Sequence, residues 1–357
     1  MKNKNRRNKI IFTLTLGLIL TANLIVDNKP WAQQKKQGKF IAISKNSIAA
    51  YSVNGIQWEK TEMPFGVYDI CYGNGKFVAI SSGGIAKAAY SADGITWKET
   101  TLPIGVYGRI CYGNSTFLMP IRSGTKNKIA YTKDGIKWKE TKLPYEIDSK
   151  ILYGNNKFLT MVGDNKISYS ADGIKWQIAT LPVRIGCPID ICYGNGIFLT
   201  ATGGHACDEK STTVYSADCI NWTAIEGAPG VELIYVDGKF IGVDDDYGGA
   251  VYSTDGINWE TSKLPDGTEW RGEIFYGNGK FIITALSGAM AAYTTDGANW
   301  KTTKLPIETD LICSGNGMFV SLEREGNGVA YSYDGIKWEK TTIPINTEWT
   351  AICYGGE

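Results

Sequence analysis

The fold is decided by Ile70-Cys-Tyr-Gly-Asn-Gly-Lys-Phe77 and Ser91-Ala-Asp-Gly-Ile-Thr-Trp97, two phrases that recur in alternation along the chain. Each copy of the second phrase ends at a tryptophan, and consecutive copies lie 37 to 46 residues apart. The eight copies end at Trp58, Trp97, Trp138, Trp176, Trp222, Trp259, Trp300 and Trp338. A period near 40 residues that fills the chain from Gly38 onward indicates one repeat domain.

Each repeat contains four short segments with strand character. In the second repeat they cover residues 69–72, 76–81, 87–91 and 95–100. Asn74-Gly75 and Asp93-Gly94 predict tight hairpin turns, because these residue types tolerate the positive φ angles of a type I′ turn. Leu102-Pro103 predicts the end of the sheet, since proline has no N–H to donate.

A four-stranded unit of this length is typical of a propeller blade. The first repeat begins at Gly38-Lys-Phe40 without its opening strand, and Trp349–Gly355 at the other end reads as that missing strand. We therefore predict an all-β, eight-bladed β-propeller of four-stranded antiparallel blades. The C-terminal strand is expected to close it by pairing with the N-terminal blade, which leaves no free edge at the seam.

The N-terminus differs from the repeats in charge and hydropathy. Residues 1–32 carry six basic side chains and one acidic side chain, so the net charge of +1 leaves the remainder at −4. A basic stretch followed by an apolar run from Ile10 to Ile25 predicts a secretory signal peptide over residues 1–32, cleaved after Ala22 or Ala32. Retention as an anchor is the alternative. Residues 33–37 are then a short linker, and 38–357 are a single propeller domain.

The second phrase resembles the Asp-box, or bacterial neuraminidase repeat. Asp is kept in seven copies, Asn54 replaces it in the first, and Cys219 replaces the glycine in the fifth. The resemblance covers about nine-tenths of the chain and implies a propeller in which the box is a turn between strands 3 and 4, away from the working face. It does not imply catalysis, since such boxes occur in proteins of many functions. From the residues alone, Asp is expected to bond N–H groups of its own turn.

The variable loops between strands 2 and 3 and the inter-blade linkers share the face opposite the boxes. Function on a rigid scaffold concentrates in variable loops, so any site is expected there. The residue before the first Ile or Leu of strand 1 would form a ring at the mouth of the central channel. We take its charged members as candidate ligand-binding residues: Asp69, Arg109, Lys150, Asp190, Glu232 and Glu273, with Leu311 and Ala351 completing the ring. Mutual neutralisation between neighbours is the alternative role.

Aromatic residues in the linkers are further candidates for ligand contact. Trp270 and Trp349 belong to the candidate site, and Tyr68, Tyr107 and Tyr145 occupy similar positions. A flat ring with a polar group suits sugar or protein recognition, whereas packing between blades is the competing role for each ring.

The fifth and sixth repeats depart most from the pattern. Cys187 and Cys207 fall on the loop face, so we predict a disulfide between them, with free thiols as the alternative. His205, Asp208 and the acidic run Asp244, Asp245 and Asp246 form a weak candidate for a cation site, against a solvated acidic patch. No catalytic residue and no cofactor can be assigned.

The expected function is non-catalytic binding of a protein or carbohydrate ligand on the loop face, by a secreted or surface-exposed monomer. Nearly balanced charge gives no indication of nucleic-acid binding, and no stable membrane span is expected after processing. The alternative is a secreted glycoside hydrolase that uses carboxylates on the same face. A sialidase is disfavoured, because the resemblance implies an arginine triad and an Arg-Ile-Pro phrase near the start, and the phrase is missing here.

Overall fold

The computed structural model describes residues 38–81, 86–103, 105, 108–123, 125–147, 150–163, 165–184, 188–202, 213–225, 232–244 and 249–356. Residues Lys36–Glu357 form one compact unit, and the predicted signal peptide and linker lie outside the described residues. Among the described residues, no helix is long and apolar enough to cross a membrane.

The described strands form seven antiparallel sheets, six of them four-stranded. The first three four-stranded sheets comprise β4 (Val67–Gly73), β5 (Lys76–Ser81), β6 (Lys87–Ser91) and β7 (Lys98–Thr101); β8 (Cys111–Gly113), β9 (Thr116–Ser123), β10 (Thr125–Thr132) and β11 (Lys139–Lys142); and β12 (Leu152–Gly154), β13 (Lys157–Met161), β14 (Lys166–Ser170) and β15 (Gln177–Thr180).

The other three four-stranded sheets comprise β16 (Pro188–Gly194), β17 (Ile197–Thr202), β18 (Thr213–Ser216) and β19 (Thr223–Ile225); β20 (Glu232–Val236), β21 (Lys239–Asp244), β22 (Gly249–Ser253) and β23 (Glu260–Lys263); and β24 (Trp270–Gly277), β25 (Lys280–Ala285), β26 (Met290–Thr294) and β27 (Lys301–Lys304). The seven-stranded sheet runs β28 (Leu311–Gly315), β29 (Met318–Leu322), β30 (Glu325–Ser332), β31 (Glu339–Gly355), β1 (Lys39–Ser44), β2 (Ile48–Ser52) and β3 (Glu59–Glu62).

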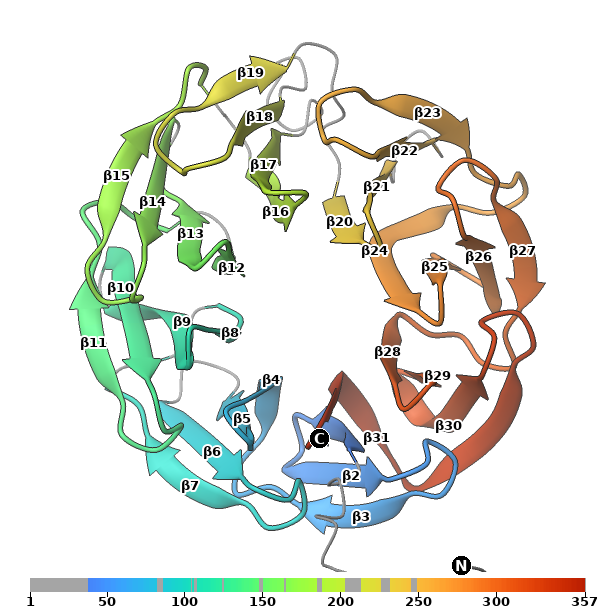
Figure 1. Ribbon diagram of the computed structural model, residues 1–357. Coiled ribbons are helices and arrows are strands. Elements are labelled where there is room, and N and C mark those ends of the chain that lie inside the picture. The colour runs from blue at the N-terminus through green and yellow to red at the C-terminus, as the bar shows by residue number, and fades with distance from the viewer. Residues whose placement is uncertain are drawn as a thin grey trace, which may run out of the picture. The chain divides into compact units, whose positions relative to one another are not determined.

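The sheets stand around a central opening, with the first strand of each repeat innermost and the fourth outermost (Figure 1). β31 joins the two ends of the chain. Its first part pairs with β30, from Glu339 opposite Tyr331, and its last part pairs with β1, where Tyr354 lies opposite Phe40. The propeller-like arrangement of antiparallel sheets agrees with the prediction.

β7 ends at Thr101, just before Leu102-Pro103, as predicted, whereas in the last repeat β31 runs on through Ile343 and Pro344. The ladder with β30 shifts register between Gly326 and Gly328, and no β30 residue is paired with Pro344. The missing proline N–H is therefore not required at that position.

The turns that contain Asp93 and its counterparts have the predicted local hydrogen bonds. Asp93 Oδ1 accepts hydrogen bonds from the N–H groups of Ile95 and Thr96, both at 2.8 Å, and from the Ser91 hydroxyl at 2.8 Å. Asn54 replaces Asp with the same result, accepting the N–H groups two and three residues later at 3.0 and 2.9 Å. An amide oxygen thus substitutes for the carboxylate in this turn.

The first phrase connects each repeat to the next. A Cβ placed on Gly73 would lie 2.4 Å from the ring of Tyr112 in the following repeat, and one on Gly113 would lie 2.1 Å from the ring of Tyr153. Only glycine leaves room for these rings. Asn74 extends the contact, because its side-chain amide donates to the Lys133 carbonyl at 3.1 Å.

A second set of contacts connects the outer strands. Thr100 Oγ1 donates to the carbonyl of Ile136 in the next box at 2.6 Å, and the same bond recurs between other neighbouring repeats. Thr341 makes it to Ile56 at 3.0 Å, which connects the last repeat to the first.

Candidate functional site

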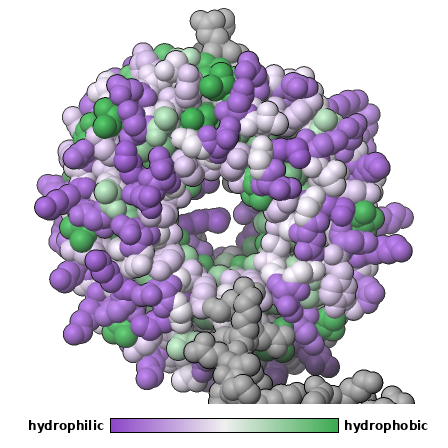
Figure 2. Space-filling view, in the orientation of Figure 1, coloured by the Kyte–Doolittle hydropathy of each residue, from purple (hydrophilic) through white to green (hydrophobic). Residues whose placement is uncertain are grey.

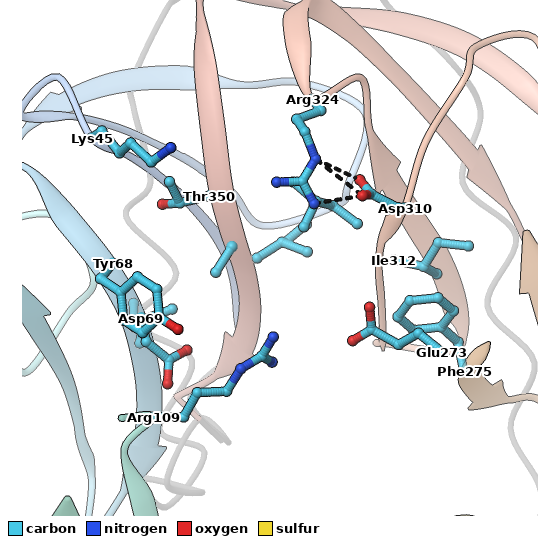
Figure 3. Close-up of a pocket in the computed structure, with 14 residues that line it drawn as sticks. Lys45, Tyr68, Asp69, Arg109, Glu273, Phe275, Asp310, Ile312, Arg324 and Thr350 are labelled. Carbon is cyan, nitrogen blue, oxygen red and sulfur yellow. Dashed lines mark hydrogen bonds and ion pairs between the residues drawn. The ribbon is translucent and has the colours of Figure 1, made fainter. Parts of the chain in front are cut away.

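Five positions of the predicted ring meet around one pocket at the channel mouth. The pocket has a volume of about 290 Å³ and is lined by Asp69, Arg109, Glu273, Leu311 and Ala351 of the ring, together with residues of the loop face. Figure 2 shows the central opening bordered by hydrophilic side chains, and Figure 3 shows the pocket. The structure therefore brings distant repeats together on the face where sequence placed a site.

Loops and linkers supply pocket residues that the sequence analysis did not select. Lys45 follows β1, Arg324 lies between β29 and β30, and Asp310 immediately precedes β28. Tyr68, in β4, is 43% exposed and also lines the pocket. One feature of the sequence could have indicated Arg324. The loop Glu323-Arg324-Glu325 differs in sequence from the corresponding loops of the other repeats.

Asp310 and Arg324 form a forked ion pair on one side of the pocket. Arg324 Nε lies 3.0 Å from each Asp310 carboxylate oxygen, and Nη2 lies 2.5 Å from Oδ2. The hydrogen bond to Asp310 raises the pKa of the Arg324 guanidinium. Two parallel N–H···O contacts fix both planes, so this pair is a rigid wall of the pocket.

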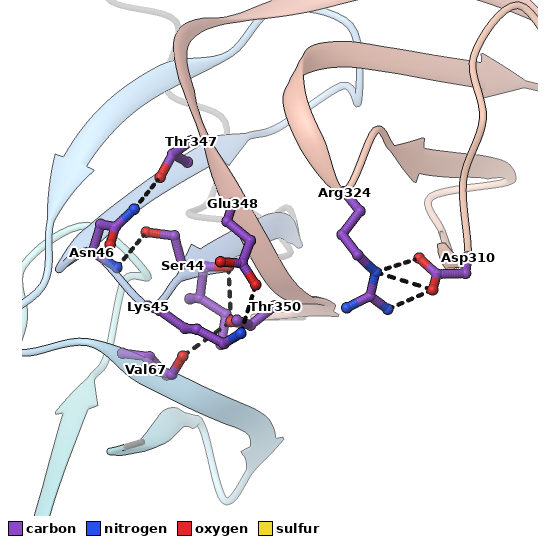
Figure 4. A network of polar contacts seen from close by, with 10 residues as sticks. Ser44, Lys45, Asn46, Val67, Asp310, Arg324, Thr347, Glu348 and Thr350 are labelled. Atoms are coloured by element: carbon purple, nitrogen blue, oxygen red, sulfur yellow. Dashed lines mark hydrogen bonds and ion pairs between the residues drawn. The ribbon is translucent and has the colours of Figure 1, made fainter. Parts of the chain in front are cut away.

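Lys45 belongs to a polar network at the seam between β1 and β31 (Figure 4). Its ammonium lies 2.5 Å from Glu348 Oε1. Nearby, Asn46 Nδ2 donates to Thr347 Oγ1 at 3.1 Å, and Thr350 Oγ1 lies 3.0 Å from the Val67 carbonyl. These contacts hold the loop after β1 against the C-terminal strand.

Two acidic members of the ring connect adjacent inner strands through the backbone. Asp69 Oδ2 accepts the N–H of Ile110 at 3.0 Å, and Asp190 Oδ2 accepts the N–H of Leu233 at 3.0 Å. Burial raises the pKa of Asp69, although the N–H groups and Arg109 oppose the shift. Such carboxylates position the strands, which is a structural role that the sequence pattern alone did not distinguish from ligand contact.

Lys150 and Asp190 neutralise each other. Lys150 Nζ lies 2.5 Å from Asp190 Oδ1, and the Asp190 side chain is only 2% exposed. These two ring residues therefore have the alternative role named above, mutual neutralisation between neighbours.

Arg109 and Glu273 differ from the other charged ring members. Both side chains are exposed in the pocket, and within the described part of the chain neither forms an ion pair shorter than 4.0 Å. Desolvation by the surrounding protein raises the pKa of the Glu273 carboxyl, and the positive charge of Arg109 opposes the shift. Glu273 thus lies in an environment that favours a partner of positive charge.

Both candidate tryptophans lie in the core. Trp349 is fully buried and donates its indole N–H to the Gly326 carbonyl at 3.2 Å, while Trp270 is 3% exposed and donates to the Pro265 carbonyl at 2.9 Å. Of the two roles considered, ligand contact and packing, both tryptophans have the packing role. Each indole fills space between strands while its N–H donates to a carbonyl. Tyr145, by contrast, is exposed, and the Lys166 ammonium lies 4.8 Å from its ring centre.

Several candidate residues lie outside the described residues: Cys187, Cys207, Tyr107, His205, Asp208, Asp245 and Asp246, together with the side chains of Glu232 and Asp244. Among the described residues, no group of three or more metal-ligating side chains is arranged to hold a metal ion.

The described cysteines offer no activated nucleophile. Cys71, Cys111, Cys192, Cys219, Cys313 and Cys353 are free thiols. Burial raises the pKa of Cys71 and Cys111 to about 12, so both stay protonated at neutral pH.

Comparison with known proteins identifies the fold. No family model and no curated protein matches the sequence. Among solved structures, inactive virginiamycin B lyase from Staphylococcus aureus, solved with quinupristin, matches with a TM-score of 0.57 and 15% identity, covering 86% of this chain and 99% of that one. AztD from Citrobacter koseri gives 0.60 and 9%, covering 90% and 98%.

BamB from Moraxella catarrhalis is a third similar structure, with a TM-score of 0.56 and 11% identity over 86% of this chain and 92% of that one. Identities this low carry the fold and not the activity. The chain therefore has an all-β, propeller-like fold that it shares with these proteins.

Proposed function

We propose that this protein is a secreted or surface-exposed, non-catalytic propeller that binds a ligand at the channel mouth on its loop face. The observation that carries the proposal is the pocket in which Arg109 and Glu273, from distant repeats, project charged groups that form no ion pair within the described chain. In a structural ion pair the two charged groups already neutralise each other, whereas in a recognition site they stay available to pair with complementary charges of the ligand.

The finer description of the scaffold is an Asp-box propeller of eight blades that closes through β31. The pairing of β31 with both β30 and β1, and the Thr341–Ile56 hydrogen bond, support counting the seven-stranded sheet as two blades that share this strand. The carboxylate geometry of the repeated turns supports the Asp-box assignment.

A peptide or protein ligand fits the pocket better than a neutral sugar. The two tryptophans considered for stacking on a sugar are buried, whereas the pocket wall carries charges of both signs. Complementary charges confer specificity on a polypeptide partner.

Glycan and peptide arrays test the proposal. Tyr68→Ala and Arg109→Ala alter the loop face, and Lys175→Ala, in a box turn at the opposite end of the blades, is the matched control. We expect array hits to weaken by about tenfold or more in the loop-face variants and to persist in the control. Hits that survive both loop-face changes and disappear in Lys175→Ala would place binding on the other face.

A glycoside hydrolase is the second candidate, favoured by the raised pKa values of Asp69 and Glu273. A general acid requires a carboxyl whose pKa is raised above its ordinary value. Hydrolysis assays on the glycan hits decide between the two. Turnover abolished by Glu273→Gln supports the hydrolase, and binding without turnover supports the recognition protein.

A further inference from the structure

We propose that the pocket binds a ligand that carries both a carboxylate and an ammonium group, with the carboxylate on Arg109 and the ammonium on Glu273. The inference rests on the proposed function, because it specifies the ligand chemistry of the same site. Short free peptides have this chemistry at their two ends, and protein segments have it in a Lys and an acidic side chain.

The other charged groups of the pocket already have partners. Asp310 and Arg324 form their forked pair, Lys45 contacts Glu348, and Asp69 accepts a backbone N–H. A ligand that competes for these groups must break an existing contact. Among the charged pocket residues that the structure describes, Arg109 and Glu273 remain for a ligand, one a cation and the other an anion.

Arg109 and Glu273 occupy positions on opposite sides of the channel mouth. Contacts between inner strands run in the order β24, β28, β31, β4 and β8, so four steps separate the strand of Glu273 from the strand that Arg109 precedes. Figure 3 shows the two side chains entering the pocket from facing walls. They are near enough for Arg109 to lower the pKa of Glu273, yet they do not form a direct ion pair.

A ligand with two opposite charges pairs with Arg109 and with Glu273 at the same time. A guanidinium binds a carboxylate through two parallel hydrogen bonds, and a cleft lined by charged groups focuses their electric field on the ligand. A ligand with only one charge leaves the opposite group facing it unpaired. Ile70, Phe275 and Ile312 also line the pocket and offer apolar contact to the uncharged part of the ligand.

The length of the ligand is testable with an oligoglycine series from glycine to pentaglycine. Each added residue extends the separation of the two charges by roughly 3.5 Å. Isothermal titration calorimetry is expected to show affinity that rises to a maximum at one length. A second arm uses an N-acetylated, C-amidated peptide with an internal Lys and an internal Glu, which separates a protein segment from a free peptide as the source.

Blocking the ligand and changing the protein form a double-mutant cycle. Amidating the best peptide removes its carboxylate and is expected to weaken binding about tenfold to wild type, but less than about twofold to Arg109→Gln. Acetylating its amine should give the same pattern with Glu273→Gln. Lys175→Gln and Glu62→Gln are charge-matched controls on other surfaces and are expected to bind like wild type.

Saturable binding in either peptide arm, with the coupling described, supports the inference. Absence of binding in both arms at millimolar concentration overturns it, as does binding that is equally sensitive to blocking in wild type and in Arg109→Gln. If the peptides fail while array hits still depend on the loop face, the proposed function stands and the ligand chemistry assigned here is wrong.

Discussion

Replacing Trp349 tests whether this residue supports the fold or contacts a ligand. The side chain is fully buried in a core cluster with Val329, Leu322 and Ile343, and its indole N–H reaches a carbonyl. Truncating a buried Trp to Ala removes its transfer free energy and leaves a cavity, so Trp349→Ala is expected to lower the free energy of unfolding by about 3–5 kcal/mol.

A second substitution divides this cost into packing and hydrogen bonding. Trp349→Phe keeps most of the apolar contact, loses the hydrogen bond and leaves the Gly326 carbonyl without its partner, so we expect a loss of about 1–3 kcal/mol. Urea denaturation followed by far-UV circular dichroism measures both values. Tyr333→Ala, at an exposed position, is the control and should stay within about 0.5 kcal/mol of wild type.

If Trp349→Ala unfolds at the wild-type urea concentration with an unchanged slope, Trp349 does not stabilise the core. A normal stability combined with lost ligand binding would return Trp349 to the recognition surface. A changed slope would instead mean that the substitution altered the surface exposed on unfolding or that unfolding is no longer a single transition.

Further predictions concern the repeated contacts and acid stability. Gly113→Ala should lose about 1–3 kcal/mol because its Cβ would lie 2.1 Å from the Tyr153 ring, whereas Gly249→Ala, with nothing within 4 Å, should be neutral or slightly stabilising by thermal denaturation. Thr341→Val removes the bond between the last and first repeats and should cost about 1 kcal/mol in the same measurement; no change would mean the bond is dispensable. In Asp93, burial opposes ionisation, but the N–H groups of its turn prevail and lower the pKa from 3.8 to about 2. The folded state therefore gains stability from this carboxylate above pH 3.8 and loses it as the pH falls towards 2, so Asp93→Asn should lose less stability than wild type between pH 5 and about pH 2 in acid titrations.

Local features of the chain were predictable because short-range geometry decides them. Asn74-Gly75 forms the predicted tight turn, with φ angles of 47° and 70°, whereas at Asp93-Gly94 only Gly94, at 74°, has a positive φ and residues 92–97 form a longer loop between β6 and β7. The alternation of strands and turns then fixes four strands per repeat. The same reasoning explains why Asn54 was compatible with its box, since any short side-chain oxygen reaches the same N–H groups.

The candidate site was only partly predictable. The ring position was read from the repeat, and Asp69, Arg109 and Glu273 do meet at one pocket. Their different roles depend on neighbours from other repeats, which no local pattern specifies. Asp69 bonds the backbone of the next repeat, whereas Arg109 forms no ion pair with the described residues and faces the pocket. The roles of the two tryptophans could not be predicted either, because an aromatic residue in a linker can lie at the surface or in the core.

The repeat, the turn signals, the closing strand and the face on which variable loops gather could be predicted from the chain alone, since they follow from turn chemistry and strand alternation over a few residues. Three features required the folded molecule: the fourth strand of the last repeat and the closing strand are one continuous β31, Asp310 and Arg324 neutralise each other, and Arg109 and Glu273 face one pocket. The cause is distance along the chain. Charges from repeats that lie far apart in sequence come together only when the sheets assemble around the channel, and their pairing is set by that assembly.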